Sequence, residues 1–423
     1  MLGTTVVTSG LLLLLAGCGF SSETKHTPVR AAQAPAAPLP IPRGTGSKTP
    51  DDFNGDGHRD LVLNDLAKAQ PHTDDPGIGI VYGSAHGLVP GTRRLLSPAT
   101  HAARVGGELP ALFDAEASCD LDGDGFTDLV VSTDPPYDGQ GRPPVPLQLL
   151  FGSPGGLTGR GVVLAVPDRA RAGNDWPDQP VCGDFDGDQQ ADLVLHATGG
   201  KLSFLRGPFS RQGAPRKAAA PLPGPGNLPT GPAADVDRDG YDDLLVRTAE
   251  RSGPSAVVLG GPDGPTRTGA VLPAGIDVAL GGFGRGKALD AAVGTMTGTA
   301  LRYDLPGAAR AALTSPGSVL DAADFDGDGL SELVSSGSRV KVFRGRAAGL
   351  SQRQMVTVQP VAHGTSRVVA LGDFDGDGRA DLVVRTYRSE TQDTVAVHPG
   401  VRRTLVSAKP TVTFSTREFL PAP

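Results

Sequence analysis

One short acidic pattern recurs six times along this chain and constrains its fold more than any other feature. Residues 120–128 are a complete copy, with Asp at positions 1, 3, 5 and 9 and Gly at position 6. The other copies begin at Asp52, Asp184, Asp235, Asp324 and Asp373. Carboxylates at alternate positions of a tight loop are typical of a cage for a hard cation. Repetition of the whole unit indicates an array of equivalent structural elements.

The residues between successive acidic loops follow one order of predicted strands. An apolar run comes directly after each loop, as in Leu129–Val131, and a second apolar run ends in Gly, as in Leu149–Gly152. A third strand then leads to the strand that enters the next loop, as in Val368–Leu371. Four short strands per unit are typical of a β-propeller blade. The 59 Gly and 38 Pro residues, each about twice ordinary usage, agree with a turn-rich all-β protein.

A seventh, degenerate unit lies between the fourth and fifth copies. Residues 282–290 keep Phe283 at position 2 and Asp290 at position 9, but glycine replaces the acids at positions 1, 3 and 5. In chain order we call these nine-residue segments loops one to seven, so that residues 282–290 are loop five. The seven units predict one all-β domain over residues 48–423, a seven-bladed β-propeller with cation-binding loops in its blades and no metal in loop five.

The repeated units resemble those of the FG-GAP/VCBS repeat family. The likeness is carried by Phe-Gly-Ser-Pro-Gly-Gly-Leu at residues 151–157 and by Asp-Phe-Asp-Gly-Asp-Gly at residues 373–378, and it extends over about residues 45–420. This resemblance implies the seven-bladed propeller of the integrin α-subunit N-terminal region. It also implies that each intact loop joins the first two strands of a blade and binds Ca²⁺.

Ca²⁺ takes six to eight oxygen ligands, which a short loop supplies from alternate side chains and a backbone carbonyl. We therefore expect about six Ca²⁺, one in each intact loop. The predicted side-chain ligands are Asp52, Asn54, Asp56 and Asp60; Asp120, Asp122, Asp124 and Asp128; Asp184, Asp186, Asp188 and Asp192; Asp235, Asp237, Asp239 and Asp243; Asp324, Asp326, Asp328 and Glu332; and Asp373, Asp375, Asp377 and Asp381. The predicted position-7 carbonyl ligands are those of His58, Phe126, Gln190, Tyr241, Leu330 and Arg379.

Two features qualify this metal prediction. The alternative to six cages is a set of empty Asx-turns, which would leave closely packed like charges unbalanced. Gln189 replaces Gly at position 6 of loop three. That position favours a positive φ, so we expect the site in loop three to be weaker or distorted.

The first residues predict export. The apolar run Leu11–Leu15 leads into Leu-Ala-Gly-Cys, which predicts a lipoprotein signal over residues 1–18 with Cys18 as the lipidation site. The alternative is an ordinary secretory signal with a chance cysteine, and residues 1–5 lack the usual basic side chains. Residues 19–47, rich in Pro and Ala, predict an extended tether. We expect a protein that is lipid-anchored to the outer face of the cell membrane, or secreted.

The two remaining cysteines, Cys119 and Cys182, each lie just before an acidic loop. In an oxidising compartment they could form a disulfide between adjacent units, and the alternative is two buried free thiols. Cys119 lies one residue before its loop and Cys182 two residues before, an offset that reverses side-chain direction on an ideal strand and argues against the bridge.

Three classes of function remain open. The first is a non-catalytic binding or adhesion module for an extracellular protein or a cell-wall polymer. The second is a polysaccharide-acting enzyme, a lyase or hydrolase built on the propeller, although no Ser-His-Asp, zinc or phosphate-loop signature is present and no catalytic residue is predicted. The third is a structural assembly partner.

The charge of the chain bears on its partners. Six bound Ca²⁺ would move the formal net charge from −7 to about +5, which favours an anionic partner such as a wall polymer. We expect no nucleic-acid partner, contact with the membrane through the lipid anchor, and a monomer.

Overall fold

The structure is a computed structural model that describes residues 37–420, except residues 172, 249–252 and 308. The predicted signal segment, Cys18 and residues 19–36 of the predicted tether lie outside the described residues. All described residues belong to one compact unit, Ala36–Pro423. None of the helices in this described part is long and apolar enough to cross a membrane.

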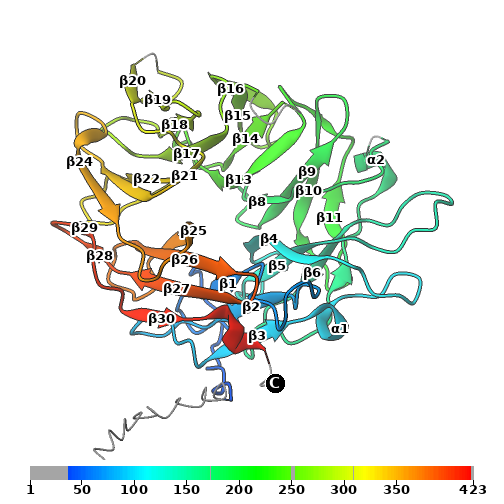
Figure 1. Ribbon diagram of the computed structural model, residues 1–423. Coiled ribbons are helices and arrows are strands. Elements are labelled where there is room, and N and C mark those ends of the chain that lie inside the picture. Colours follow the sequence, from blue (N-terminus) through cyan, green and yellow to red (C-terminus); the bar gives the residue numbers. More distant parts are fainter. Residues whose placement is uncertain (1–36, 172, 249–252, 308, 421–423) are drawn as a thin grey trace, which may run out of the picture. The chain divides into compact units, whose positions relative to one another are not determined.

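Seven antiparallel sheets of three or more strands follow one another in the described chain, and we call them blades one to seven (Figure 1). Blade one contains β1 (Leu61–Leu63), β2 (Ile78–Val81) and β3 (Arg93–Leu96), followed by α1 (Pro98–His101). Blade two contains β4 (Phe113–Cys119), β5 (Asp128–Thr133), β6 (Leu147–Leu150) and β7 (Val162–Val163), followed by α2 (Asp168–Arg171). Blade three contains β8 (Val181–Gly183), β9 (Asp192–Ala197), β10 (Lys201–Phe209), β11 (Pro215–Ala218) and β12 (Leu222–Pro223).

The remaining blades have four strands each. Blade four contains β13 (Leu228–Ala234), β14 (Asp243–Arg247), β15 (Ser255–Leu259) and β16 (Arg267–Leu272). Blade five contains β17 (Asp277–Gly281), β18 (Asp290–Gly294), β19 (Thr299–Arg302) and β20 (Arg310–Leu313). Blade six contains β21 (Val319–Ala323), β22 (Glu332–Ser336), β23 (Val340–Arg344) and β24 (Ser351–Val358). Blade seven contains β25 (Thr365–Gly372), β26 (Asp381–Ser389), β27 (Gln392–His398) and β30 (Val412–Phe414), with the hairpin β28 (Gly400–Val401) and β29 (Leu405–Val406) before β30 and the 3₁₀-helix η1 (Thr416–Phe419) after it.

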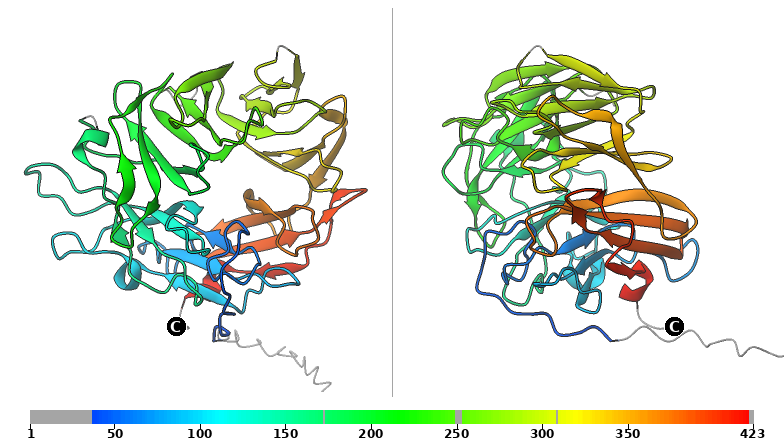
Figure 2. Two further views of the ribbon diagram at one scale, coloured as in Figure 1. Left: turned by 180° about the vertical axis from the view of Figure 1, so that it is seen from behind. Right: turned by 90° about the vertical axis from the view of Figure 1, so that its left-hand side faces the viewer.

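The blades close into a ring because each buries both of its faces. Seven apolar clusters occur among the described residues, and each is shared by two neighbouring blades. Six join consecutive blades, and the seventh joins the last to the first through Val383 of blade seven and Leu61 of blade one. Figure 2 shows the closure from behind, where the blue first blade lies beside the red last blade. The predicted all-β seven-bladed propeller is confirmed.

Among the described residues, blade one lacks the inner strand found in the other blades. In blades two to seven the strand before the acidic loop lies innermost (Figure 1). The residues before loop one instead lie against that loop, and the Gly44 N–H donates to the Asn54 carbonyl oxygen at 3.0 Å. A Cβ on Gly44 would lie 1.8 Å from the Gly55 carbonyl oxygen. Residues 39–47, predicted as tether, therefore pack on the propeller, because an extended, glycine-containing segment also suits a position against a loop.

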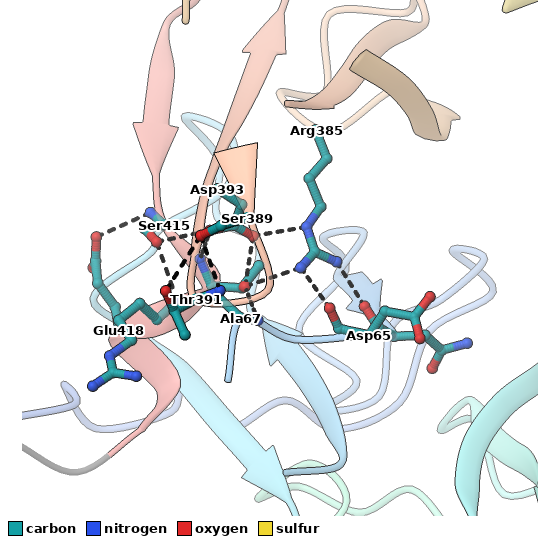
Figure 3. Close-up of polar contacts among 11 residues, drawn as sticks. Asp65, Ala67, Arg385, Ser389, Thr391, Asp393, Ser415 and Glu418 are labelled. Atoms are coloured by element: carbon teal, nitrogen blue, oxygen red, sulfur yellow. Dashed lines mark hydrogen bonds and ion pairs between the residues drawn. The ribbon is translucent and has the colours of Figure 1, made fainter. Parts of the chain in front are cut away.

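A buried ion pair reinforces the closure between blades seven and one (Figure 3). Arg385 on β26 and Asp393 on β27 are both buried, with Nε and Oδ2 2.7 Å apart. The same guanidinium donates to the carbonyl oxygens of Asn64 at 2.7 Å and Asp65 at 2.6 Å, both in blade one. The Asp393 carboxylate accepts the Thr416 hydroxyl at 2.6 Å and so also holds η1. One ion pair thus joins two strands of the last blade, the C-terminal 3₁₀-helix and the first blade.

A disulfide joins blades two and three. It links Cys119 on β4 to Cys182 on β8, which are 63 residues apart in sequence. The offset that argued against this bridge is what allows it: successive side chains point to opposite faces of a strand, so one cysteine faces forward along the ring and the other faces back. Both pack against the cluster between these two blades. Closing a chain loop of this length stabilises a fold by about 4 kcal/mol in the chain-entropy account.

The buried contacts of Arg385 predict that its substitution strongly lowers the free energy of unfolding. Arg385→Met would leave the buried Asp393 carboxylate without its cation and two blade-one carbonyls without a donor, and should lower the free energy of unfolding by about 3 to 5 kcal/mol. Arg388→Met, on the same strand but exposed, should change it by less than about 0.5 kcal/mol. Urea unfolding followed by circular dichroism measures both. Equal effects of the two substitutions would contradict the role assigned to Arg385.

Candidate metal centres

Each loop packs against the next blade of the ring. The side chain at position 2 is buried in the apolar cluster shared with the next blade. These seven residues, each in a different cluster, are Phe53, Leu121, Phe185, Val236, Phe283, Phe325 and Phe374. Loops also bond to one another: the N–H of Thr127 donates to the Asp52 carbonyl oxygen at 3.0 Å, and that of Ala380 to the Asp324 carbonyl oxygen at 2.8 Å. Ordering a loop therefore orders an interface between two blades.

The turn within each intact loop needs two residues with positive φ. Positions 4 and 6 have φ between 60° and 93° in all six. Gln189 at position 6 of loop three has φ 65°, and Arg238 at position 4 of loop four, which the sequence pattern did not identify, has φ 60°. The position-1 carboxylate holds the turn, as where Asp120 accepts the N–H groups of Gly123 and Gly125, both at 2.8 Å.

The carboxylate at position 9 ties the loop to a neighbouring strand of its own blade. In loop two, Asp128 accepts the N–H of Leu121 at 2.9 Å and, at the end of β6, that of Gly152 at 2.8 Å. The same pair of bonds occurs in loops one, four, six and seven. Asp290 of loop five, where the other acids are replaced, also accepts two backbone N–H groups. Position 9 therefore supports the fold whether or not it also binds a cation.

Position 3 supplies oxygens without a partner in the protein. In five loops its Oδ1 atom is buried and accepts no hydrogen bond, in Asn54, Asp122, Asp186, Asp237 and Asp326. A buried oxygen without a donor costs free energy unless something else satisfies it. Three acidic residues lie together in five loops, with one oxygen from each within 4.8 Å of the others. A donor set made only of oxygens at this spacing fits a metal ion of the hard type.

These groups of three differ in part from the predicted ligand sets. Positions 1, 3 and 9 converge in loops two, three, six and seven, whereas positions 1, 3 and 5 converge in loop four, without Asp243. The position-5 side chain holds a turn in every intact loop, loop four included: Asp124 Oδ1 accepts the N–H of Phe126 at 3.1 Å, and Asp239 Oδ1 accepts that of Tyr241 at 3.2 Å. The position-5 residues outside the groups of three are Asp56, Asp124, Asp188, Asp328 and Asp377.

Loop one forms no such group, since it has Asn54 at position 3. The Asn54 amide donates to Asp56 at 3.0 Å and to the Pro42 carbonyl oxygen at 3.1 Å, so this loop holds the preceding segment as well. The position-7 carbonyls of His58, Phe126, Gln190, Tyr241, Leu330 and Arg379 stay a prediction.

Arginine side chains that the pattern did not identify lie against five loops. Arg206 Nη1 lies 3.1 Å from Asp186 Oδ2, and Arg344 pairs with Asp326 in the same way. Both arginines follow an apolar run and directly precede a Gly, a signal present in the sequence. The other pairs are Arg211 with Asp122 and Asp124, Arg216 with Asp188, Arg267 with Asp239, and Arg379 with Asp377. The chain thus balances part of the loop charge itself.

Burial shifts the pKa values of the position-9 carboxyls upward. Loss of hydration raises the pKa of Asp60 and Asp128 to about 8, and neighbouring loop carboxylates add to the shift while backbone N–H donors oppose it. By the same cause the pKa values of Asp192, Glu332 and Asp381 rise to about 7. Without a cation, the folded loops therefore favour protonated acids near neutral pH.

Comparison with known proteins finds one family and several solved structures that are similar to this chain. Residues 324–384, which contain loops six and seven, match the FG-GAP-like repeat family, which confirms the resemblance seen in the sequence. No curated protein matches the chain. Similar solved structures include BBS1N in complex with ARL6DN (14% identity, 88% of this chain and 96% of that one, TM-score 0.47). Others are the V. cholerae biofilm matrix protein Bap1 (12%, 86% and 89%, 0.39) and the Pseudomonas aeruginosa periplasmic gluconolactonase PpgL (16%, 84% and 82%, 0.37). Likeness at this level carries no functional conclusion.

The strained turn of loop three predicts a stabilising substitution. Gln189→Gly removes the steric cost of a positive φ and should raise the free energy of unfolding by about 0.5 to 1 kcal/mol. Gln190→Gly, one residue on and without a positive φ, should lower it by a similar amount. Thermal unfolding in excess Ca²⁺ compares the two variants. A loss of stability in Gln189→Gly would show that the side chain makes a compensating contact.

The raised pKa values predict an unusual pH dependence of the chelated protein. The folded pKa values of Asp60 and Asp128, about 8, exceed those of the unfolded chain. The contribution of these two carboxyls to the free energy of unfolding is therefore fully present at low pH and is lost as the pH rises through about 8. The melting temperature in EDTA should therefore fall between pH 5 and pH 8.5. Added Ca²⁺, which competes with protons, should raise it more at pH 8.5 than at pH 5. A calcium-induced shift that is independent of pH would contradict this linkage.

Proposed function

We propose that this propeller of FG-GAP-like repeats is an exported, calcium-stabilised, non-catalytic binding module. Its partner is an extracellular protein or an anionic cell-wall polymer, and a lipid on Cys18 anchors it to the membrane. The observation that carries the calcium part is the set of buried, unpartnered position-3 oxygens, which a cation would satisfy. The hard, oxygen-only donor set favours Ca²⁺ over softer metals.

The role of the ions in this proposal is architectural. The loops place apolar side chains between blades and bond to one another, so cation binding would reinforce the ring. A site with a Kd of about 10⁻⁴ to 10⁻³ M stabilises by about 0.4 to 1.4 kcal/mol in millimolar Ca²⁺. Six such sites would contribute about 2 to 8 kcal/mol, which is comparable to the net stability of a whole domain.

The disulfide supports the exported location. Cys119–Cys182 joins two blades, and such bonds persist in oxidising compartments outside the cytosol. Extracellular fluid also supplies Ca²⁺ at the concentrations that weak loop sites require.

A binding assay with parallel detection of products tests the proposed function. Calcium-loaded protein should bind cell-wall fractions saturably, without release of sugar products, and binding to acidic polymers should weaken as salt rises. Release of unsaturated sugars would instead support the polysaccharide lyase. Absence of binding to every wall fraction and to intact cells would overturn the binding role and leave the structural assembly partner.

A further inference from the structure

A groove separates blade six from the β28–β29 hairpin of blade seven. It has a volume of about 740 Å³ and lies between residues 354–359 at the end of β24 and residues 402–408 around β29. In Figure 1 β24 lies beside this hairpin. β24 and β29 belong to different sheets, so no strand ladder joins them across the groove.

One wall of the groove is an open sheet edge. β24 pairs with β23 on one side only, and at eight residues it is the longest outermost strand of the described blades. Exposed strand edges are normally protected by proline or several charges. The sequence Ser-Gln-Arg-Gln-Met-Val-Thr-Val of β24 has no proline and one charged residue. Because β24 pairs only with β23, the backbone groups on its outer side are available for another strand.

The floor of the groove is apolar. Leu405 and Val406 of β29 are buried in the cluster between blades six and seven, and Val356 of β24 packs against the same cluster. Met355 is exposed at the rim. Leu405 has φ 64°, an uncommon conformation for a residue other than glycine. Backbone strain of this kind is concentrated at functional positions.

The rim of the groove carries positive charge, and only one of its four arginines is paired with a carboxylate of the described chain. Four arginines and no carboxylate line it. Arg344 is paired with Asp326 and donates to the carbonyl oxygen of Arg403 at 2.9 Å, which fixes the hairpin. Arg346, Arg402 and Arg403 are exposed and take part in none of the ion pairs found among the described residues.

We infer that this groove binds an extended acidic peptide segment of a partner protein as an added strand on β24. Strand addition uses the free backbone groups of the edge, and alternate side chains of the peptide point to opposite sides. Apolar side chains on one side of the bound peptide would pack on the floor of the groove. Carboxylates on its other side would form ion pairs with the arginines of the rim. This inference rests on the binding role proposed above and gives that role a surface and a partner chemistry.

A fluorescent peptide of alternating Glu and Val residues tests the inference by anisotropy with the full calcium-loaded protein. Saturable binding is expected, weakened at least tenfold by the double substitution Arg402→Glu and Arg403→Glu. The matched control is Arg310→Glu with Arg388→Glu, which changes the net charge equally at exposed sites away from the groove and should alter affinity less than threefold. Thermal unfolding confirms that both variants are folded.

Two further probes separate a strand partner from a polyanion. A peptide N-methylated at alternate residues cannot form the ladder and should lose binding. The inference is overturned in favour of an anionic polymer if the N-methylated peptide binds as tightly as the unmodified one. It is also overturned if polyphosphate of the same charge competes as well as the unmodified peptide. If the arginine variant loses no peptide affinity but the protein still binds wall fractions, the groove assignment fails and the binding role stands. If neither peptide nor wall fraction binds, both fail.

Discussion

The ring depends on one repeated contact, in which each acidic loop places its position-2 side chain between its own blade and the next. A blade is a small sheet with two apolar faces, and neither can be covered by the blade itself. Phe53, Phe185 and Phe325 each lie in the cluster that their blade shares with the following one. The polar part of the same loop carries the carboxylates. The carboxylates that could hold a cation and the side chain that packs between blades therefore belong to one nine-residue segment.

The contact between the last and first blades differs from the other six. Phe374 fills the cluster as its counterparts do, and the Arg59 guanidinium lies over its ring at 5.6 Å. Among the described residues the strands of blade one and those of blade seven form separate sheets, so strand exchange does not close the ring. Instead, the Arg385 guanidinium, which is paired with Asp393, donates to the carbonyl oxygens of Asn64 and Asp65 in blade one. Closure is thus achieved by hydrogen bonds and packing between blade seven and the three-stranded blade one.

The sequence was sufficient to predict the fold, because the repeat records the period of the blades directly. It also located all seven loops and the position-6 strain at Gln189. It did not predict which oxygens converge. Asp124, Asp188 and Asp239 all hold the turn of their own loop, but only Asp239 also joins a group of three, and this depends on side-chain geometry. The predicted tether was wrong for residues 39–47, because composition does not distinguish a free extended segment from one that lies on a loop. Predicting the disulfide required knowing to which side of its blade each cysteine side chain points.

The arginines beside the loops imply that the six intact loops are not equivalent. Arg206 within β10 and Arg344 at the end of β23, whose side chains are 20% and 19% exposed, pair with Asp186 and Asp326. Arg211 and Arg267 are 48% and 61% exposed, so solvent screens their pairs and a cation displaces them at little cost. A guanidinium keeps its charge at every accessible pH, so loss of a proton from the arginine cannot release the first two pairs. A cation in loop three or six must therefore share or displace a partly buried positive charge, and these two loops should bind it more weakly than loops two and four.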